Sequence, residues 1–347
     1  MIIKPDVAKR SNTANNPFLS VDYVPPTLGD AKIYTHKHSN NGIHANISPK
    51  GRHGNQQQPS SNDSKISQSP SSQDANMEEP LGGDRPYTIL GELGKGAFGT
   101  TTLVMDERNN ELCVLKRIIC ESVEQANEAL DEARLMSNLR AKSKHVVEVR
   151  DFFLDIRDNN VLSVCLVMEY VPGGDLAAKL KANMQPYFLN EAKIINLTKQ
   201  LLTGLIVIHN NGLVHRDLKP ANLLLSDEAV EDTGGVNLIK ICDFGVATAL
   251  SHSANTIVGT PHYMAPEIVE GDYGNMADVW SLGCILYEMC ALKRPDFAMT
   301  SLVDVLNEVR SRGYSTTITA LLERMLQRDP SKRGSATSLL NFLTEED

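Results

Sequence analysis

The chain has 347 residues, 41 % of them hydrophobic, which is enough to fill a globular core; it has no run of about 18 apolar residues, so no membrane-spanning helix is predicted. Its formal net charge is −9 at pH 7, and residues 1–84 are neutral with eight basic and eight acidic residues, so the net charge lies after residue 84. An acidic folded part argues against a general nucleic-acid binder, because such proteins usually present a basic surface.

Residues 1–84 are predicted to form a disordered, low-complexity tail. The stretch 39–72 consists mainly of Asn, Ser, Gln, Gly, Pro and His and contains no aromatic residue. Such a composition cannot bury enough apolar surface to offset the entropy of ordering the chain. Autoinhibition, docking and localisation are all compatible with this tail.

The hydrophobic pattern changes twice after residue 84. Up to about residue 170, the runs 90–93, 100–105, 112–119, 146–153 and 161–168 are typical of strands and 124–139 of one helix. From about residue 175 the pattern is helical, as in 191–210, where apolar residues recur at steps of three and four. We therefore predict a bilobal α+β domain over residues 85–345, with a β-rich N-lobe (about 85–170) and a larger helical C-lobe (about 171–345).

All six cysteines lie after residue 84, and none belongs to a Cys-x-x-Cys pair. Most of them sit inside apolar runs. This pattern predicts reduced, buried thiols in an intracellular protein, cytoplasmic or nuclear or both, rather than disulfides or a zinc site.

The first motif with chemical meaning is the glycine-rich run GKGAFG at residues 94–99. Glycine lets a backbone approach phosphate groups closely. A dinucleotide-binding fold would need a helix directly after these glycines, whereas residues 100–105 are strand-like. We therefore expect a hairpin folding over phosphates, although this motif alone is also compatible with a hairpin that binds no ligand.

Four further motifs follow in order: VLK at 114–116, HRDLKPAN at 215–222, DFG at 243–245 and APE at 265–267. A lysine at the end of an apolar strand is costly to bury unless an anion meets it, and Glu132 in the predicted helix could reach Lys116. In this order and at these spacings, the motifs resemble those of the eukaryotic protein kinases over about residues 87–345.

This resemblance implies a serine/threonine protein kinase that uses ATP with Mg²⁺ or Mn²⁺ to phosphorylate protein hydroxyls. Asp217 would accept the substrate proton, while Lys219 and Lys116 would contact phosphate groups. Asn222 and Asp243 would supply oxygen ligands to the metal. The residues that the resemblance implies for ATP binding are Leu93, Gly94, Lys95, Gly96, Ala97, Phe98, Gly99, Thr101, Val114, Lys116, Glu132, Met168, Glu169, Val171, Asp175 and Leu224.

The segments EYVPGGDL at 169–176, GTPHYMAPE at 259–267 and CALKRPDF at 290–297 are most similar to those of NIMA-related kinases. That resemblance implies a signalling, cell-cycle or cytoskeletal kinase with protein substrates and no nucleic-acid or membrane partner. It also implies Thr256 as the main activating phosphosite. No coiled-coil segment follows the last predicted helix in this sequence, so we expect a monomer.

The family pattern also predicts two structural supports and leaves one competing function. Asp278 would brace the catalytic loop, and Arg333 would pair with Glu267. The competing function is a pseudokinase scaffold that binds partners without catalysis. Such a scaffold need not keep the lysine, the two aspartates and the asparagine of the motifs, and this chain has all four, which favours an active enzyme.

Overall fold

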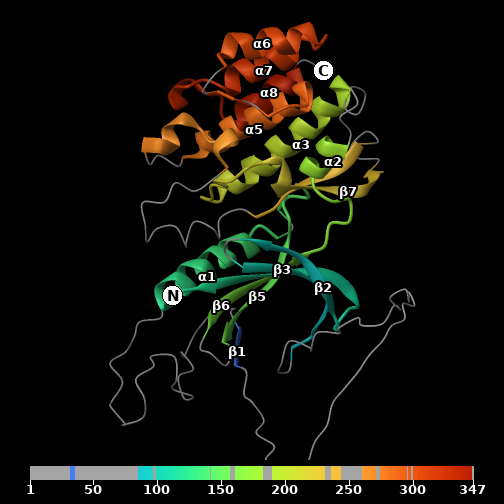
Figure 1. Ribbon diagram of the computed structural model, residues 1–347, viewed down its shortest axis with the longest axis vertical. Helices are drawn as coiled ribbons and strands as arrows, with labels where there is room; N and C mark the ends of the chain where they lie inside the picture. Colours follow the sequence, from blue (N-terminus) through green and yellow to red (C-terminus); the bar gives the residue numbers. More distant parts are fainter. Residues whose placement is uncertain are drawn as a thin grey trace, which may run out of the picture.

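The computed structural model describes residues 32–35, 85–96, 99–140, 142–156, 161–182, 190–230, 236–243, 260–270, 274–294, 296–297 and 300–345. They form two lobes. The β-rich lobe lies in the lower half of Figure 1, and the helical lobe lies above it. The strands are β1 (Lys32–Thr35), β2 (Tyr87–Gly96), β3 (Gly99–Asp106), β4 (Glu111–Cys120), β5 (Val149–Ile156), β6 (Leu162–Glu169), β7 (Leu223–Val230) and β8 (Val236–Ile241). The helices are α1 (Val123–Ser137), α2 (Leu176–Ala182), α3 (Glu191–Asn210), α5 (Asn275–Ala291), α6 (Leu302–Ser311), α7 (Thr316–Met325) and α8 (Ala336–Glu345).

The N-lobe is a six-stranded sheet in the order β1-β5-β6-β4-β3-β2, with α1 packed against one face. All neighbouring strands are antiparallel except β1 and β5, which are parallel. Helix α1 begins after Ser122, whose hydroxyl accepts a hydrogen bond from the Gln125 backbone N–H as an N-cap. The five strands and the helix predicted between residues 90 and 168 are confirmed, with ends that differ by a few residues.

Strand β1 lies inside the segment that composition predicts to be disordered, so that prediction is wrong for these four residues. Ile33, Tyr34 and Thr35 are β-branched or aromatic, and such residues favour strands. The prediction depended on the polar stretch 39–72 and overlooked this short β-prone run. The other predictions for residues 1–31 and 36–84 lie outside the described residues.

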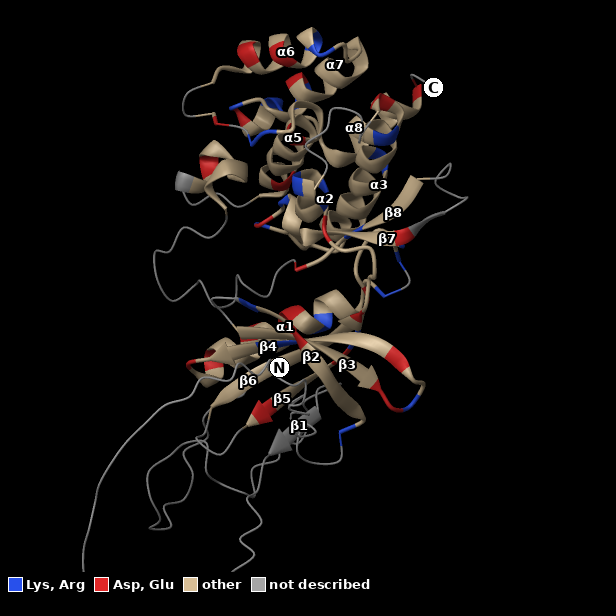
Figure 2. Ribbon diagram, turned by 45° about the vertical axis from the view of Figure 1, so that its right-hand side comes forward, with Lys and Arg blue, Asp and Glu red and all other residues tan. Residues whose placement is uncertain are grey.

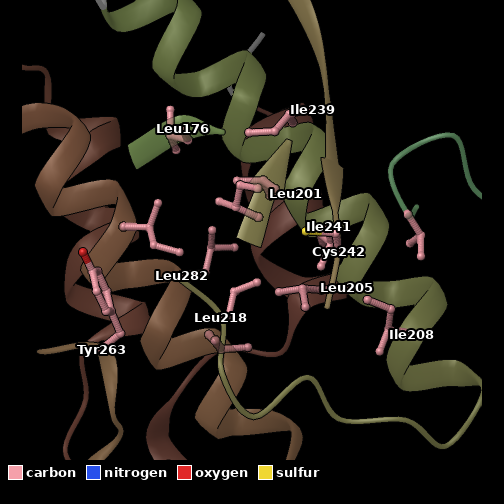
Figure 3. Packing of buried hydrophobic residues seen from close by; sticks show 14 of the residues in the cluster. Leu176, Leu201, Leu205, Ile208, Leu218, Ile239, Ile241, Cys242, Tyr263 and Leu282 are labelled. Carbon is pink, nitrogen blue, oxygen red and sulfur yellow. The ribbon is translucent and has the colours of Figure 1, made fainter. Parts of the chain in front are cut away.

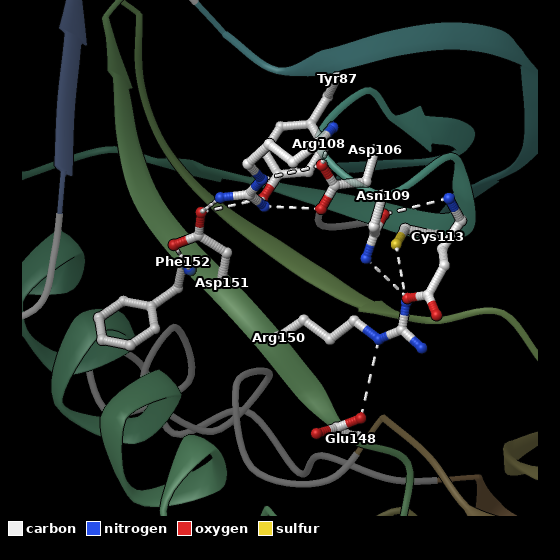
Figure 4. Close-up of polar contacts among 10 residues, drawn as sticks. Tyr87, Asp106, Arg108, Asn109, Cys113, Glu148, Arg150, Asp151 and Phe152 are labelled. Atoms are coloured by element: carbon white, nitrogen blue, oxygen red, sulfur yellow. Dashed lines mark hydrogen bonds and ion pairs between the residues drawn. The ribbon is translucent and has the colours of Figure 1, made fainter.

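Tyr87, Arg108 and the carboxylates around them connect the ends of β2, β3 and β5 (Figure 4). Arg108 bonds both carboxylate oxygens of Asp106, with N–O distances of 2.8 and 2.7 Å, and also donates to the Tyr87 hydroxyl at 2.6 Å. Tyr87 in turn donates to Asp151 at 2.9 Å. Burial is the main reason that the pKa of Tyr87 is raised, so the phenol remains a donor at neutral pH.

The C-lobe core is built around α3, which packs against α5, α8 and β8. Leu201, Leu205 and Ile208 on one face of α3 have no exposed surface, and Figure 3 shows Leu201 and Leu205 near Ile241. Helix α5 is buried almost along its whole length. This core is the rigid base from which the loop before β7 extends.

Acidic and basic residues occur in both lobes (Figure 2). The six cysteines are all buried and free, as the sequence predicted. None of the described helices combines the length and the hydrophobicity needed to cross a bilayer.

Candidate active site

The glycine-rich run forms the predicted hairpin between β2 and β3, with Gly94 opposite Thr101 and Gly96 opposite Gly99. Gly99 has a φ of +152°, and a Cβ atom on it would lie 1.7 Å from the Arg117 carbonyl oxygen. A Cβ atom on Gly94 would meet no atom within 4 Å. Gly99 is therefore required by the fold itself, whereas Gly94 leaves open space that a phosphate group can approach.

Three members of the predicted hairpin site are described only in part or not at all. Ala97 and Phe98 lie outside the described residues, and for Gly96 only the backbone is described. Leu93 is a large apolar residue that is 51 % exposed on β2. It is free to contact a ligand.

Lys116 on β4 forms an ion pair with Asp243, with Nζ 3.0 Å from Oδ1. The sequence predicted Glu132 as its partner, and the structure instead places this ammonium on the aspartate that follows β8. Asp243 has a left-handed backbone conformation with φ of 59°, which directs its carboxylate across the interface between the lobes. The pair joins the predicted phosphate-binding lysine to a predicted metal ligand.

Asp217 is the centre of a polar cluster in the loop between α3 and β7. Lys219 Nζ lies 2.6 Å from Asp217 Oδ2, and the Thr260 hydroxyl donates to Asp217 Oδ1 at 3.1 Å. Lys219 also donates to Thr260 at 3.1 Å, and Asn222 Nδ2 donates to the Asp217 carbonyl at 2.8 Å. The structure therefore brings together three predicted site residues, while the position of Thr260 between two of them was not predicted.

Asp278 at the start of α5 fixes the backbone of this loop. Its two carboxylate oxygens accept the backbone N–H groups of His215 at 2.8 Å and Arg216 at 2.9 Å. His209 Nε2 lies 2.8 Å from the same carboxylate, which is 1 % exposed. Arg216 has a φ of 68°, so this brace holds a residue in a conformation that non-glycine residues rarely adopt. The predicted role of Asp278 is confirmed.

The His215 ring connects the loop to the end of β8. Its Nε2 atom lies 3.0 Å from the Cys242 carbonyl oxygen, which can only accept, so Nε2 carries the proton. Its Nδ1 atom then accepts from the Asp217 backbone N–H at 3.3 Å. Burial lowers the pKa of His215, so the neutral ring keeps both bonds at pH 7.

Cys242 directly precedes Asp243, a predicted metal ligand, so its thiol could either pack in the core or face a bound nucleotide. The residue is 8 % exposed and belongs to the main apolar cluster. Burial raises the pKa of its thiol well above the usual value, so the sulfur is protonated and packs as a small apolar group.

Three of the residues predicted to bind ATP, Val114, Met168 and Leu224, belong to the apolar cluster whose members come from both lobes. Val114 and Met168 are cross-strand neighbours on β4 and β6. Leu224 on β7 belongs to the same apolar cluster as these two residues. Asp175 caps α2, because its carboxylate accepts from the Ala178 backbone N–H at 2.7 Å.

The segment connecting the lobes has a polar link that the sequence did not indicate. Lys240 Nζ on β8 lies 2.6 Å from Glu169 Oε1, and the Glu148 backbone N–H donates to the same oxygen at 2.8 Å. The Glu169 N–H donates to the Glu148 carbonyl oxygen at 3.0 Å. A pair 71 positions apart leaves no local pattern in the sequence, so only the fold reveals it.

Asn222 and Asp243 fit a divalent cation that arrives with phosphate groups. The Cys242 N–H donates to the Asn222 carbonyl at 3.0 Å, so the two predicted ligands are held on adjoining segments. Within the described part of the chain, no group of three or more His, Cys, Asp or Glu side chains could hold a metal alone. An amide and a carboxylate oxygen suit Mg²⁺, which takes one or two protein ligands and fills its shell with water and phosphate oxygens.

A β-rich lobe with a glycine hairpin and a lysine, facing a helical lobe whose loop carries Asp, Lys and Asn, defines the bilobal phosphotransferase class of fold. A sequence profile of the protein kinase domain matches residues 87–342. The chain therefore belongs to the protein kinase family, as the motifs predicted.

The curated relatives that this chain resembles are serine/threonine-protein kinases. Serine/threonine-protein kinase Nek3 of Mus musculus is 37 % identical over 268 residues, 73 % of this chain and 48 % of that protein. Nek11 of Homo sapiens is 36 % identical over 272 residues, 74 % of this chain and 40 % of that protein. Nek6 of Oryza sativa subsp. japonica is 32 % identical over 265 residues, 73 % of this chain and 47 % of that protein. The chain thus matches less than half of the length of these relatives, and its predicted similarity to NIMA-related kinases is confirmed.

Proposed function

We propose that this chain transfers the γ-phosphate of ATP to serine and threonine hydroxyls of protein substrates. The observation that carries the proposal is the cluster of Asp217, Lys219 and Thr260, which lies next to the Lys116–Asp243 pair between the lobes. The names of the relatives, which are serine/threonine-protein kinases, support Ser and Thr as the accepting residues. The signalling, cell-cycle or cytoskeletal role stays a prediction from the resemblance of the motifs.

Each side chain has a role that follows from its position. Asp217 has one oxygen bonded to a hydroxyl and the other to an ammonium, so its carboxylate can orient a substrate hydroxyl and take its proton. Lys219 is 2.6 Å from that carboxylate and can neutralise charge on the transferring group. Lys116 would exchange its contact with Asp243 for the α- and β-phosphates of ATP.

Asn222 and Asp243 would hold the Mg²⁺ that accompanies ATP, and Mn²⁺ has similar ligand preferences. The cation supplies charge neutralisation at the phosphate oxygens when it is bound. The protein contributes the positions of these two ligands, through the bond between the Asn222 carbonyl and the Cys242 N–H and through the left-handed backbone of Asp243.

The experiment that tests this proposal compares wild-type protein with Asp217→Ala and with the control Asp227→Ala, which changes an exposed aspartate on β7. Transfer from labelled ATP–Mg²⁺ to casein should fall by roughly 10²- to 10⁴-fold in Asp217→Ala only. Nucleotide affinity should be retained in both variants. No transfer by wild-type protein, even after phosphorylation by a cell extract, would favour the pseudokinase scaffold.

We further propose that phosphorylation of Thr256, which lies outside the described residues, raises this activity. Arg216 in the catalytic loop is the cation that such a phosphate would pair with. The variant Thr256→Ala should lose the gain in transfer rate that follows phosphorylation, whereas Ser253→Ala should keep it. Equal gains in both variants would rule out Thr256 as the activating site.

A further inference from the structure

The outer edge of the N-lobe sheet is closed by a strand from far upstream in the chain. Without β1, the edge strand would be β5. Strand β1 pairs with it in parallel through four residues, from Lys32 opposite Phe153 to Thr35 opposite Ile156 (Figure 1). An edge strand presents unpaired N–H and C=O groups that can accept a further strand. We propose that residues 32–35 are an intramolecular docking strand that occupies the β5 edge and couples the N-terminal segment to helix α1.

The side chains of β5 fix the strand with which β1 pairs. Asp155 is opposite Tyr34 in the register, and none of its side chain is exposed. Its carboxylate pairs with Arg85 Nη2 at 2.5 Å and with Arg117 Nη2 at 3.2 Å. Because side chains alternate along a strand, Asp155 lies on the face of the sheet opposite Leu154. These ion pairs therefore tie β5 to β4 and to the residues just before β2, so that β1 pairs with a strand that is held in place.

The same strand provides the surface on which α1 rests. Phe152 and Leu154 of β5 belong to one apolar cluster with Ala129 and Ala133 of α1. Strand β5 thus has β1 along one edge, β6 along the other, and α1 on one face. Pairing by β1 restricts the backbone that supports α1, and α1 carries Glu132.

The docking is suited to exchange rather than to permanent attachment. Parallel neighbours need a connection of a dozen or more residues, and β1 and β5 are separated in the sequence by residues 36–148. Being part of the same chain gives the strand a high effective concentration at the edge. The hydrogen bonds of only four residues are opposed by a comparable entropy of ordering them. An extended segment of another protein could therefore displace the strand.

A disulfide trap tests the register in the full chain. Thr35→Cys with Ile156→Cys joins paired residues, whereas Lys32→Cys with Ile156→Cys places the cysteines three residues out of register, about 10 Å apart along the strand. A disulfide requires Cα atoms within about 7 Å, and the six native cysteines are all buried. Mild oxidation should link the matched pair at least about tenfold faster than the mismatched pair, within one chain. Equal rates, or links between chains, would overturn the proposal.

Hydrogen exchange tests the coupling without any cross-link or nucleotide. Ile33→Pro removes a backbone donor from β1 and breaks the ladder, while His38→Pro makes the same change beyond the paired residues. Amides of β5 and α1 should exchange at least about threefold faster in Ile33→Pro than in His38→Pro. Unchanged exchange in β5 would contradict docking, and faster exchange in β5 alone would contradict the coupling to α1. Neither result depends on the proposed phosphate transfer.

Discussion

Single residues in this site are constrained either by the fold or by a ligand, and two of the three hairpin glycines, Gly94 and Gly99, allow the two constraints to be separated. In Gly99→Ala, the new methyl group would collide with the Arg117 carbonyl at a φ of +152°. We expect the free energy of unfolding to fall by roughly 2–3 kcal/mol. In Gly94→Ala, where no atom lies within 4 Å, it should change by less than about 0.5 kcal/mol.

Urea unfolding measures the stability of both glycine variants, and steady-state kinetics measures the KM for ATP. Gly94→Ala should raise that KM while the protein remains as stable as wild type, because its methyl group enters the space assigned to phosphate. Equal losses of stability in the two variants would contradict the assignment of Gly99 to the fold and of Gly94 to the ligand.

Asp278 allows a second test at the residue scale, because its carboxylate accepts two backbone N–H groups and faces His209. In Asp278→Asn, an amide NH₂ group replaces one carboxylate oxygen, so one of the two backbone N–H groups faces a donor in place of an acceptor. We expect a loss of about 2–3 kcal/mol in unfolding free energy and a lower kcat. The matched change Asp304→Asn at the exposed capping box of α6 should cost less than about 1 kcal/mol. A stable Asp278→Asn protein with wild-type kcat would disprove the bracing role.

At the scale of elements, a buried ion pair ties the segment before α5 to the loop before α8. Arg333 contacts Glu267 through Nη1 at 2.6 Å and Nη2 at 3.0 Å, and the arginine side chain has no exposed surface. The sequence prediction of this pair is confirmed. Removing one partner leaves a buried charge, so Glu267→Gln should cost about 3–5 kcal/mol of unfolding free energy.

The neighbouring pair Lys332–Asp329 is the control for Glu267→Gln, because its lysine is 72 % exposed and its charges are 3.7 Å apart. Lys332→Ala should change the unfolding free energy by less than about 1 kcal/mol. Thermal unfolding of both variants distinguishes the two pairs. A small effect of Glu267→Gln would mean that water or another cation compensates Arg333.

The sequence predicts elements well wherever one periodicity persists, as in α3, whose predicted and observed bounds are the same, 191–210. It failed for β1, because four β-prone residues within a polar segment become a strand only when β5 offers an edge. The motifs likewise predicted that Asp217, Lys219 and Asn222 share one loop, where they are in contact. They could not predict that Lys116 pairs with Asp243, or that Lys240 reaches Glu169, because those contacts depend on how the two lobes meet.

At the scale of the whole molecule, buried histidines make stability depend on pH. His145 is 6 % exposed, lies 3.2 Å through Nδ1 from the Ile239 carbonyl, and is flanked by Lys144 and Lys240. Burial, opposed by that hydrogen bond, lowers its pKa below the ordinary 6.5, as burial also does for His215. The unfolded chain therefore binds more protons below pH 6.5, and stability present above that pH is lost as the pH falls.

Urea unfolding between pH 7.5 and 5.5 should thus show a free energy of unfolding that decreases once the pH is below 6.5, by up to about 1.4 kcal/mol per pH unit for each buried histidine. The carboxyl groups whose pKa is lowered, such as Asp106 and Glu308, have ordinary values of 3.8 and 4.5, so their contribution is lost at lower pH. His145→Gln keeps an N–H donor for the Ile239 carbonyl but cannot titrate in this range. The variant should have a shallower pH dependence than wild type. Parallel curves would mean that His145 keeps the same proton affinity in the folded and unfolded chain, and the burial argument would then be wrong.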